Sequence, residues 1–199
     1  MRNPPHHRAA HRAVLTATVL FLTGTLNGCM AAPVPHNTAS PVAEATATET
    51  PPVFASSEEA LAVATATYSA YLSAGDVAGK IGSDSWNEYL SFTTGPERDG
   101  VTSSRTALEA EGRSLTGSTA FDSMKIQMSS ALPDATWEIR TYLCLDITHS
   151  QLLNSSGQPV NDSEGPLRWP MVVRFVTSQE DSQQLLISES TVWSGSNFC

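Results

Sequence analysis

In the stretch TWEIRTYLCLDIT, residues 136–148, apolar and polar residues alternate. One set of alternate positions holds the apolar side chains of Trp137, Ile139, Leu143, Leu145 and Ile147. The other set holds Glu138, Arg140, Tyr142, Cys144 and Asp146. A period of two is typical of a β-strand with one buried face. The stretch therefore predicts a strand whose apolar side belongs to the core.

Three further segments predict strands of the same sheet. They are SMKIQMSS (123–130), LRWPMVVRFVT (167–177) and QQLLISESTVW (183–193). Pro170 lacks the amide hydrogen that a sheet ladder needs, so it predicts an edge or a bulge at the start of the third strand. The polar residues 178–183 predict a hairpin loop between the last two strands.

The residues before these strands have the periodicity of a helix. Apolar residues recur at helical spacing along 57–74. Ser56 and Glu59 have the spacing of a capping box, which marks the beginning of the helix. Gly75 predicts its end.

Two shorter helices are predicted at 84–92 and 104–112, with the polar stretch TTGPERDG (93–100) as a loop between them. Helices followed by antiparallel strands predict an α+β fold. Its architecture is expected to be three N-terminal helices packed on a curved four-stranded antiparallel sheet.

The N-terminal residues have the composition of a secretory signal. Arg2, Arg8 and Arg12 precede any acidic residue, and an uncharged, mostly apolar run follows at 13–26. This run is shorter than the ~20 residues that a spanning helix needs, so it predicts a signal peptide. A hydrophobic core helix is the alternative, which the Pro-rich segment after the run disfavours.

The residues Leu26-Asn27-Gly28-Cys29 resemble the lipobox of bacterial lipoproteins. The resemblance implies a diacylglycerol joined to Cys29 and removal of residues 1–28 as a signal peptide. Asn27 departs from the pattern, in which Ala, Ser, Thr or Val is more usual. Plain secretion after cleavage near AAP (31–33) is the alternative. We expect a protein anchored by lipid to the outer, extracytoplasmic face of the cell membrane.

The part of the chain beyond Cys29 is acidic. It holds all 20 Asp and Glu but only eight Lys and Arg, a net charge of −12. Nucleic acids and anionic lipid headgroups both bind basic surfaces. We therefore expect no nucleic-acid partner, and attachment to the membrane through the N-terminal acyl chains alone.

A change of composition divides this part of the chain. Residues 29–55 are rich in Pro, Ala and Thr and predict a lipid-anchored, disordered linker, because they bury too little apolar surface to offset the entropy of ordering. Residues 56–199 predict a single domain, because this length is common for one domain.

If Cys29 carries the lipid, Cys144 and Cys199 are the thiols that remain in an oxidising compartment. A disulfide between them would tie down the C-terminus, and the tail would then cover the strand face that carries Tyr142 and Asp146. Two reduced thiols are the alternative.

The order of three helices and four strands over residues 57–196 resembles the NTF2-like cone, also called the SnoaL-like or cystatin-like fold. With the terminal WSGSNFC (193–199), it looks most like the NTF2-like domains of anchored lipoproteins from high-GC Gram-positive bacteria. Such cones hold a pocket, in which enzymatic relatives place an Asp or His base and a Tyr or acid donor. The resemblance directs attention to Tyr142 and Asp146, which share one strand face.

The sequence predicts a non-catalytic module that binds a small apolar ligand or a cell-envelope protein. It offers no catalytic pair, and His149 has no second His or acid at the spacing of a zinc site. We therefore expect no catalytic residues, no metal and no cofactor. The alternative, a pocket enzyme of isomerase or dehydratase type, rests on the analogy of fold.

Overall fold

The computed structural model describes residues 52–80, 84–160 and 165–199. The predicted signal peptide, Cys29 and most of the predicted linker lie outside these residues. No helix within the described ranges is long and apolar enough to cross a membrane.

Helix α1 (Ser57–Ala78) begins where the sequence predicts, since the N–H of Glu59 donates to the Ser56 side chain at 3.1 Å. The prediction that Gly75 ends the helix is wrong, because α1 continues by a further turn to its C-cap at Gly79. A glycine inside a helix costs only about 1 kcal/mol. The neighbouring Ala74 and Ala78 are buried against the rest of the domain.

Helix α2 (Trp86–Ser91) lies within its predicted range, whereas α3 (Gly95–Ala110) begins well before residue 104. The polar stretch predicted as a loop is therefore the N-terminal part of a helix. Pro96 is compatible with this position because the first turn of a helix leaves its N–H groups unpaired anyway. Gly-Pro marks a turn and a helix start equally well, which explains the error.

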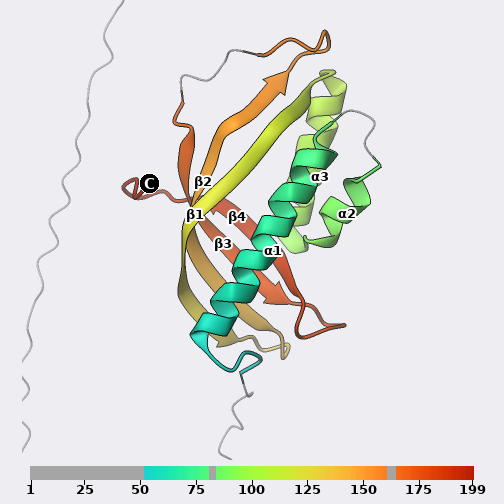
Figure 1. Ribbon diagram of the computed structural model, residues 1–199. Helices are drawn as coiled ribbons and strands as arrows, with labels where there is room; N and C mark the ends of the chain where they lie inside the picture. The colour runs from blue at the N-terminus through green and yellow to red at the C-terminus, as the bar shows by residue number, and fades with distance from the viewer. Residues whose placement is uncertain (1–51, 81–83, 161–164) are drawn as a thin grey trace, which may run out of the picture. The chain divides into compact units, whose positions relative to one another are not determined.

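Four strands follow: β1 (Ser114–Ala131), β2 (Trp137–Leu153), β3 (Arg168–Thr177) and β4 (Leu185–Val192). They form one four-stranded antiparallel sheet, as predicted, and the strand order is β1-β2-β3-β4. The pairing of β1 with β2 shifts register at three places, and such bulges bend strands. The helices lie over one face of the bent sheet, α1 crossing it diagonally (Figure 1). This α+β arrangement is consistent with an NTF2-like cone.

Pro170 pairs with Cys144 of β2 without a register shift, so the predicted bulge is absent. On the other side of β3 the register with β4 begins only at Met171. The Pro170 carbonyl accepts from the N–H of Trp193 at 2.8 Å. Its ring nitrogen has no hydrogen to return that bond. The ladder between β3 and β4 therefore ends at this level.

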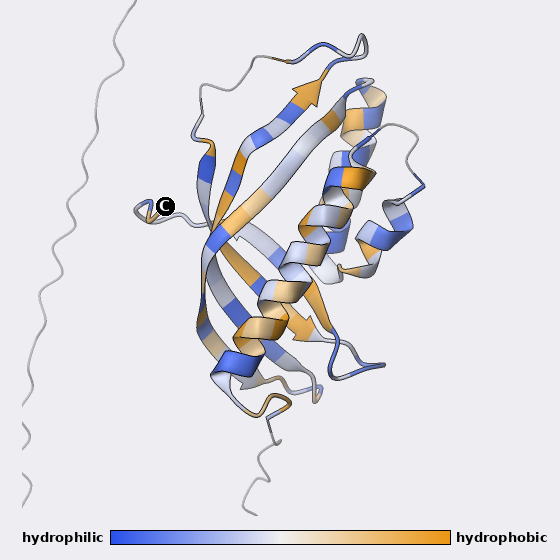
Figure 2. Ribbon diagram, viewed as in Figure 1, coloured by the Kyte–Doolittle hydropathy of each residue, from blue (hydrophilic) through white to orange (hydrophobic). Residues whose placement is uncertain are grey.

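The core lies between α1 and the inner face of the sheet. Its largest fully buried side chains are Tyr68, Phe175, Ile139, Leu143, Ile187 and Val173. Leu61 and Trp86, apolar residues of the predicted helices 57–74 and 84–92, are only partly buried and lie outside this core. Phe54 is 5% exposed and packs into the core, so the packed domain begins before residue 56. The apolar end of β3 and the polar loop that follows it are distinct in Figure 2.

Candidate functional site

The C-terminal tail is held against β2. Cys144 and Cys199 lie at disulfide distance with their Cα atoms 5.6 Å apart, and Cys144 is buried. The rings of Trp193 and Phe198 pack edge-on against Tyr142, with centroid distances of 5.4 and 5.9 Å. The tail therefore covers part of the outer sheet face, the face away from the helices.

Tyr142 and Asp146 both lie on this outer face, but the structure does not bring them into one pocket. Tyr142 lines a hollow of about 250 Å³ to which Asp146 does not contribute. Asp146 accepts the N–H of Thr148 at 2.9 Å and pairs with Arg168 at 3.0 Å, and these contacts hold its pKa below its ordinary value. The Asp146 side chain is still 26% exposed. The expectation that the tail hides Asp146 from solvent is therefore wrong. The tail is tethered at Cys144 and does not extend over it.

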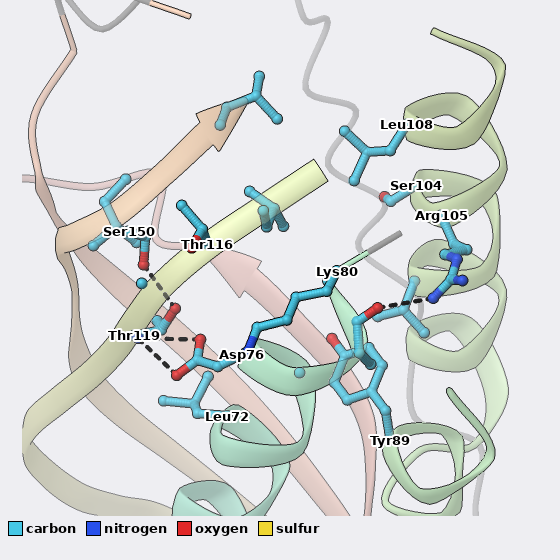
Figure 3. Close-up of a pocket in the computed structure, with 18 of the residues that line it drawn as sticks. Leu72, Asp76, Lys80, Tyr89, Ser104, Arg105, Leu108, Thr116, Thr119 and Ser150 are labelled. Carbon is cyan, nitrogen blue, oxygen red and sulfur yellow. Dashed lines mark hydrogen bonds between the residues drawn. The ribbon is translucent and has the colours of Figure 1, made fainter. Parts of the chain in front are cut away.

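The large cavity lies on the opposite, inner face. It has a volume of about 950 Å³ and is bordered by the C-terminal half of α1, by α2 and α3, and by β1 and β2. Its apolar wall includes Leu72, Trp86, Val101, Leu108, Leu145 and Ile147. Figure 3 shows Lys80 and Tyr89 across from Thr116 of β1 and from Ser104 and Leu108 of α3. This volume is in the range of sites that hold small molecules.

Two glycines of α1 bring the cavity wall together. A β-carbon on Gly75 would lie 3.0 Å from the Tyr89 ring, and one on Gly79 would lie 2.9 Å from the Leu115 side chain. The Gly79 carbonyl accepts the N–H of Leu115 at 2.9 Å, which joins the end of α1 to the start of β1. The glycine predicted as a helix stop is instead a site of close approach.

A chain of three hydrogen-bonding side chains lies in the wall of this cavity. Tyr89 of α2 donates to the hydroxyl of Tyr71 of α1 at 2.9 Å, and Tyr71 donates to a carboxylate oxygen of Glu97 of α3 at 2.6 Å. The two phenol rings are stacked with centroids 4.9 Å apart. Each helix thus contributes one member, so the chain ties the three helices together.

Burial shapes the protonation of this chain. It raises the pKa of the Glu97 carboxyl above its ordinary value, against the lowering effect of the hydrogen bond from Tyr71. It also raises the pKa of Tyr71, and that of Tyr89 to about 12. Both phenols are therefore neutral at physiological pH.

Two further charged side chains of the wall, Asp76 and Arg105, are engaged with protein atoms. Asp76 accepts the N–H of Thr119 with both carboxylate oxygens, at 3.1 and 3.0 Å. Arg105 donates to the carbonyl of Ala78 at 2.8 Å and pairs with Glu109. These contacts leave the apolar side chains as the main surface offered to a ligand.

Sequence reasoning missed this group of residues. Tyr71 and Tyr89 lie within the predicted helices 57–74 and 84–92, and Glu97 lies within the stretch 93–100 that the sequence predicts as a loop. The signal that could have found them was Pro96 after Gly95, which also marks a helix start. A helix beginning there carries Glu97 in its first turn, beside the other two helices.

No protein-family model matches this sequence, and no curated protein matches it. Among solved structures, the intermembrane space region of the chloroplast protein ARC6 is similar over 68% of this chain and 97% of its own, at 13% identity and a TM-score of 0.49. A periplasmic fragment of TraM is similar over 70% of this chain and 98% of its own, at 11% identity and a TM-score of 0.43.

A protein from Catenulispora acidiphila, solved in complex with S-DNPA, is similar over 66% of this chain and 90% of its own, at 16% identity and a TM-score of 0.39. These TM-scores lie below 0.5, and no family is assigned from them. The order of the elements and the topology of the sheet define the α+β fold.

Proposed function

We propose that this protein is a lipid-anchored, extracytoplasmic protein whose domain binds a small apolar ligand in the inner cavity, without catalysis. The observation that carries the proposal is the cavity itself, which has a volume of about 950 Å³ and a mostly apolar wall. An apolar ligand placed there removes apolar surface from water, which stabilises the complex by roughly 25 cal/mol per Å².

The polar groups of the wall support binding rather than catalysis. A general base must reach a proton of the substrate with a hydrogen bond. The Glu97 carboxylate already accepts from Tyr71, and both oxygens of Asp76 accept from the Thr119 amide. These groups organise the protein around the cavity.

The anchor is proposed from the sequence at Cys29. Two acyl chains suffice for stable attachment to a bilayer. A Cys29→Ser substitution removes the thiol to which they would be joined, so we expect it to move the protein from the membrane fraction to the soluble fraction. Cys144→Ser is the matched control and should stay with the membranes. Sedimentation of the Cys29→Ser protein with membranes contradicts the anchor.

Ligand binding is tested with the full chain carrying Cys29→Ser, purified without detergent. A solvatochromic naphthalene dye should bind and shift its emission to the blue as it enters an apolar site. Val101→Trp fills the cavity with a larger side chain and should weaken dye binding at least tenfold. Val77→Trp is the matched control, because Val77 is 46% exposed and does not line the cavity.

Equal dye binding by the two Trp variants would contradict the proposal, and so would a chain that binds no dye. Retained secondary structure, measured by circular dichroism, confirms that the Val101→Trp protein is folded. The dye signal then reports on the cavity alone.

A pocket enzyme is the second candidate, and the raised pKa of Glu97 inside the cavity is the observation that favours it. The two functions differ in what happens to a bound compound. A binding module returns the compound unchanged after prolonged incubation, whereas an isomerase or dehydratase converts it. Conversion that Glu97→Gln abolishes would replace the binding proposal with the enzymatic one.

A further inference from the structure

The hydrogen-bond chain in the cavity wall has a direction. An ionised carboxylate only accepts, so Tyr71 gives its single hydroxyl proton to Glu97. Because that proton is used, Tyr89 must give its own proton to Tyr71. The Tyr89 oxygen is left with acceptor capacity and no proton to offer.

We propose that the inner cavity selects an apolar molecule that bears a hydroxyl group, and that this hydroxyl donates its hydrogen bond to the Tyr89 oxygen. The inference rests on the proposed ligand-binding function, because it names the ligand class of that same cavity. Tyr89 lines the cavity together with Tyr71 and Glu97.

The charges around Tyr89 favour a donor over an acceptor. Glu97 lies at the far end of the hydrogen-bond chain from Tyr89. Asp76 of α1 lies on the cavity side (Figure 3). The negative charge of both carboxylates adds to the effect of burial in raising the pKa of Tyr89. A carbonyl or carboxylate oxygen of a ligand would meet two negative groups and receive no proton from Tyr89.

Lys80 is the group that could favour an anionic ligand instead. It is exposed at the C-terminal end of α1, where it lines the cavity. Ion pairs at such exposed positions are screened by solvent and contribute little to affinity. The partly buried acceptor at Tyr89 is the stronger determinant, because a polar ligand group that is buried without a partner there pays its full desolvation cost.

The inference is tested by competition against the dye in the full chain carrying Cys29→Ser. The competitors are 2-undecanol, 2-undecanone and undecanoate, which share one chain length and differ in the polar group. The alcohol donates and accepts, the ketone only accepts, and the carboxylate carries a charge. We expect the alcohol to compete about 5–10-fold more tightly than the ketone, as one hydrogen bond of typical net strength predicts.

Tyr89→Phe removes the acceptor while keeping the ring. We expect the ratio between alcohol and ketone to fall to about one in this variant, with the affinity for the ketone unchanged. Tyr142→Phe is the matched control on the outer face and should keep the ratio of the unsubstituted chain.

The inference is overturned if the ketone or undecanoate competes more tightly than the alcohol, or if Tyr89→Phe keeps the preference for the alcohol. If Tyr89→Phe does not fold, the comparison of the three compounds on the unsubstituted chain decides. Dye binding in the cavity without any preference for the alcohol rejects this inference and leaves the proposed function intact. Failure of the dye and all three compounds to bind rejects both.

Discussion

The two faces of β2 differ in what they contain and in what they can do. The inner face carries Ile139 and Leu143, which are fully buried under α1, and Leu145, which borders the cavity. The outer face carries a network of charges and the attachment of the C-terminal tail at Cys144. The inner face therefore combines the core with a large space for a ligand, whereas the outer face is partly covered by the C-terminal tail and has only a small hollow.

The environment of each face determines how a polar residue on it behaves. Asp146 and Glu97 are both carboxylates paired with protein groups. On the outer face, hydrogen bonds with Thr148 and Arg168 lower the pKa of Asp146. On the inner side, burial raises the pKa of Glu97. Only the second carboxylate shares a cavity with apolar walls.

The largest effect on stability is expected on the outer face. Cys144→Ala removes the link to Cys199 and should lower the free energy of unfolding by about 2–5 kcal/mol, because the unfolded chain gains freedom. Urea denaturation of the non-reduced protein measures the loss, and dye binding in the inner cavity should persist. Two free thiols titrated in the denatured, non-reduced Cys29→Ser chain would show that the link is absent.

The next largest effect on stability is expected at Tyr71, the central member of the hydrogen-bond chain Tyr89–Tyr71–Glu97. Tyr71→Phe leaves the partly buried Glu97 carboxylate without its phenol donor, at a cost of about 1–3 kcal/mol. Tyr142→Phe, whose ring packs on the tail, should cost clearly less. Equal urea midpoints for the two variants would show that the hydrogen-bond chain does not contribute to stability.

A smaller effect is expected in the dependence of stability on pH. Burial raises the pKa of Glu97 in the folded protein above its ordinary value of 4.5. The unfolded chain therefore releases this proton at a lower pH than the folded protein does. The free energy of unfolding should therefore fall as the pH rises from about 4.5 through the raised pKa, and this contribution should then level off. Glu97→Gln should remove this part of the slope in urea melts across pH 4–8. An unchanged slope would show that Glu97 does not bind its proton more tightly in the fold.

The smallest effect is expected at Asp146. Its ion pair with Arg168 is accessible to solvent and screened by it. Asp146→Asn should change neither the competition of the alcohol against the dye nor the urea midpoint by more than a conservative surface substitution does. A loss of ligand binding in this variant would move the functional site to the outer face.

Periodicity predicted the fold because the spacing of apolar residues within each helix or strand marks the face that it buries. The alternation in 136–148 predicted β2 and its inner face, and the capping residues Ser56 and Glu59 predicted the start of α1. Gly75 and the Gly95-Pro96 pair were misjudged because these residues suit both a turn and a close packing site or helix start. Local sequence does not distinguish these uses.

The candidate site could not be predicted from the sequence because its members are far apart along the chain. Tyr71, Tyr89 and Glu97 come from three helices, and only the packing of these helices brings them together. Tyr142 and Asp146 lie four residues apart on one strand, and the resemblance to NTF2-like cones suggested a shared pocket for them. Spacing along a strand predicts a shared face, but it does not predict which face holds the cavity.

The most direct test of ligand binding in the inner cavity is photo-labelling with an undecanol that carries a diazirine. The label is activated on the full chain carrying Cys29→Ser, and the labelled peptides are mapped by mass spectrometry. We predict labels on cavity-lining residues of α1 and α3 such as Leu72, Val101 and Leu108, with strong reduction by Val101→Trp. Labels confined to the outer face around Tyr142 and Trp193 would contradict the account.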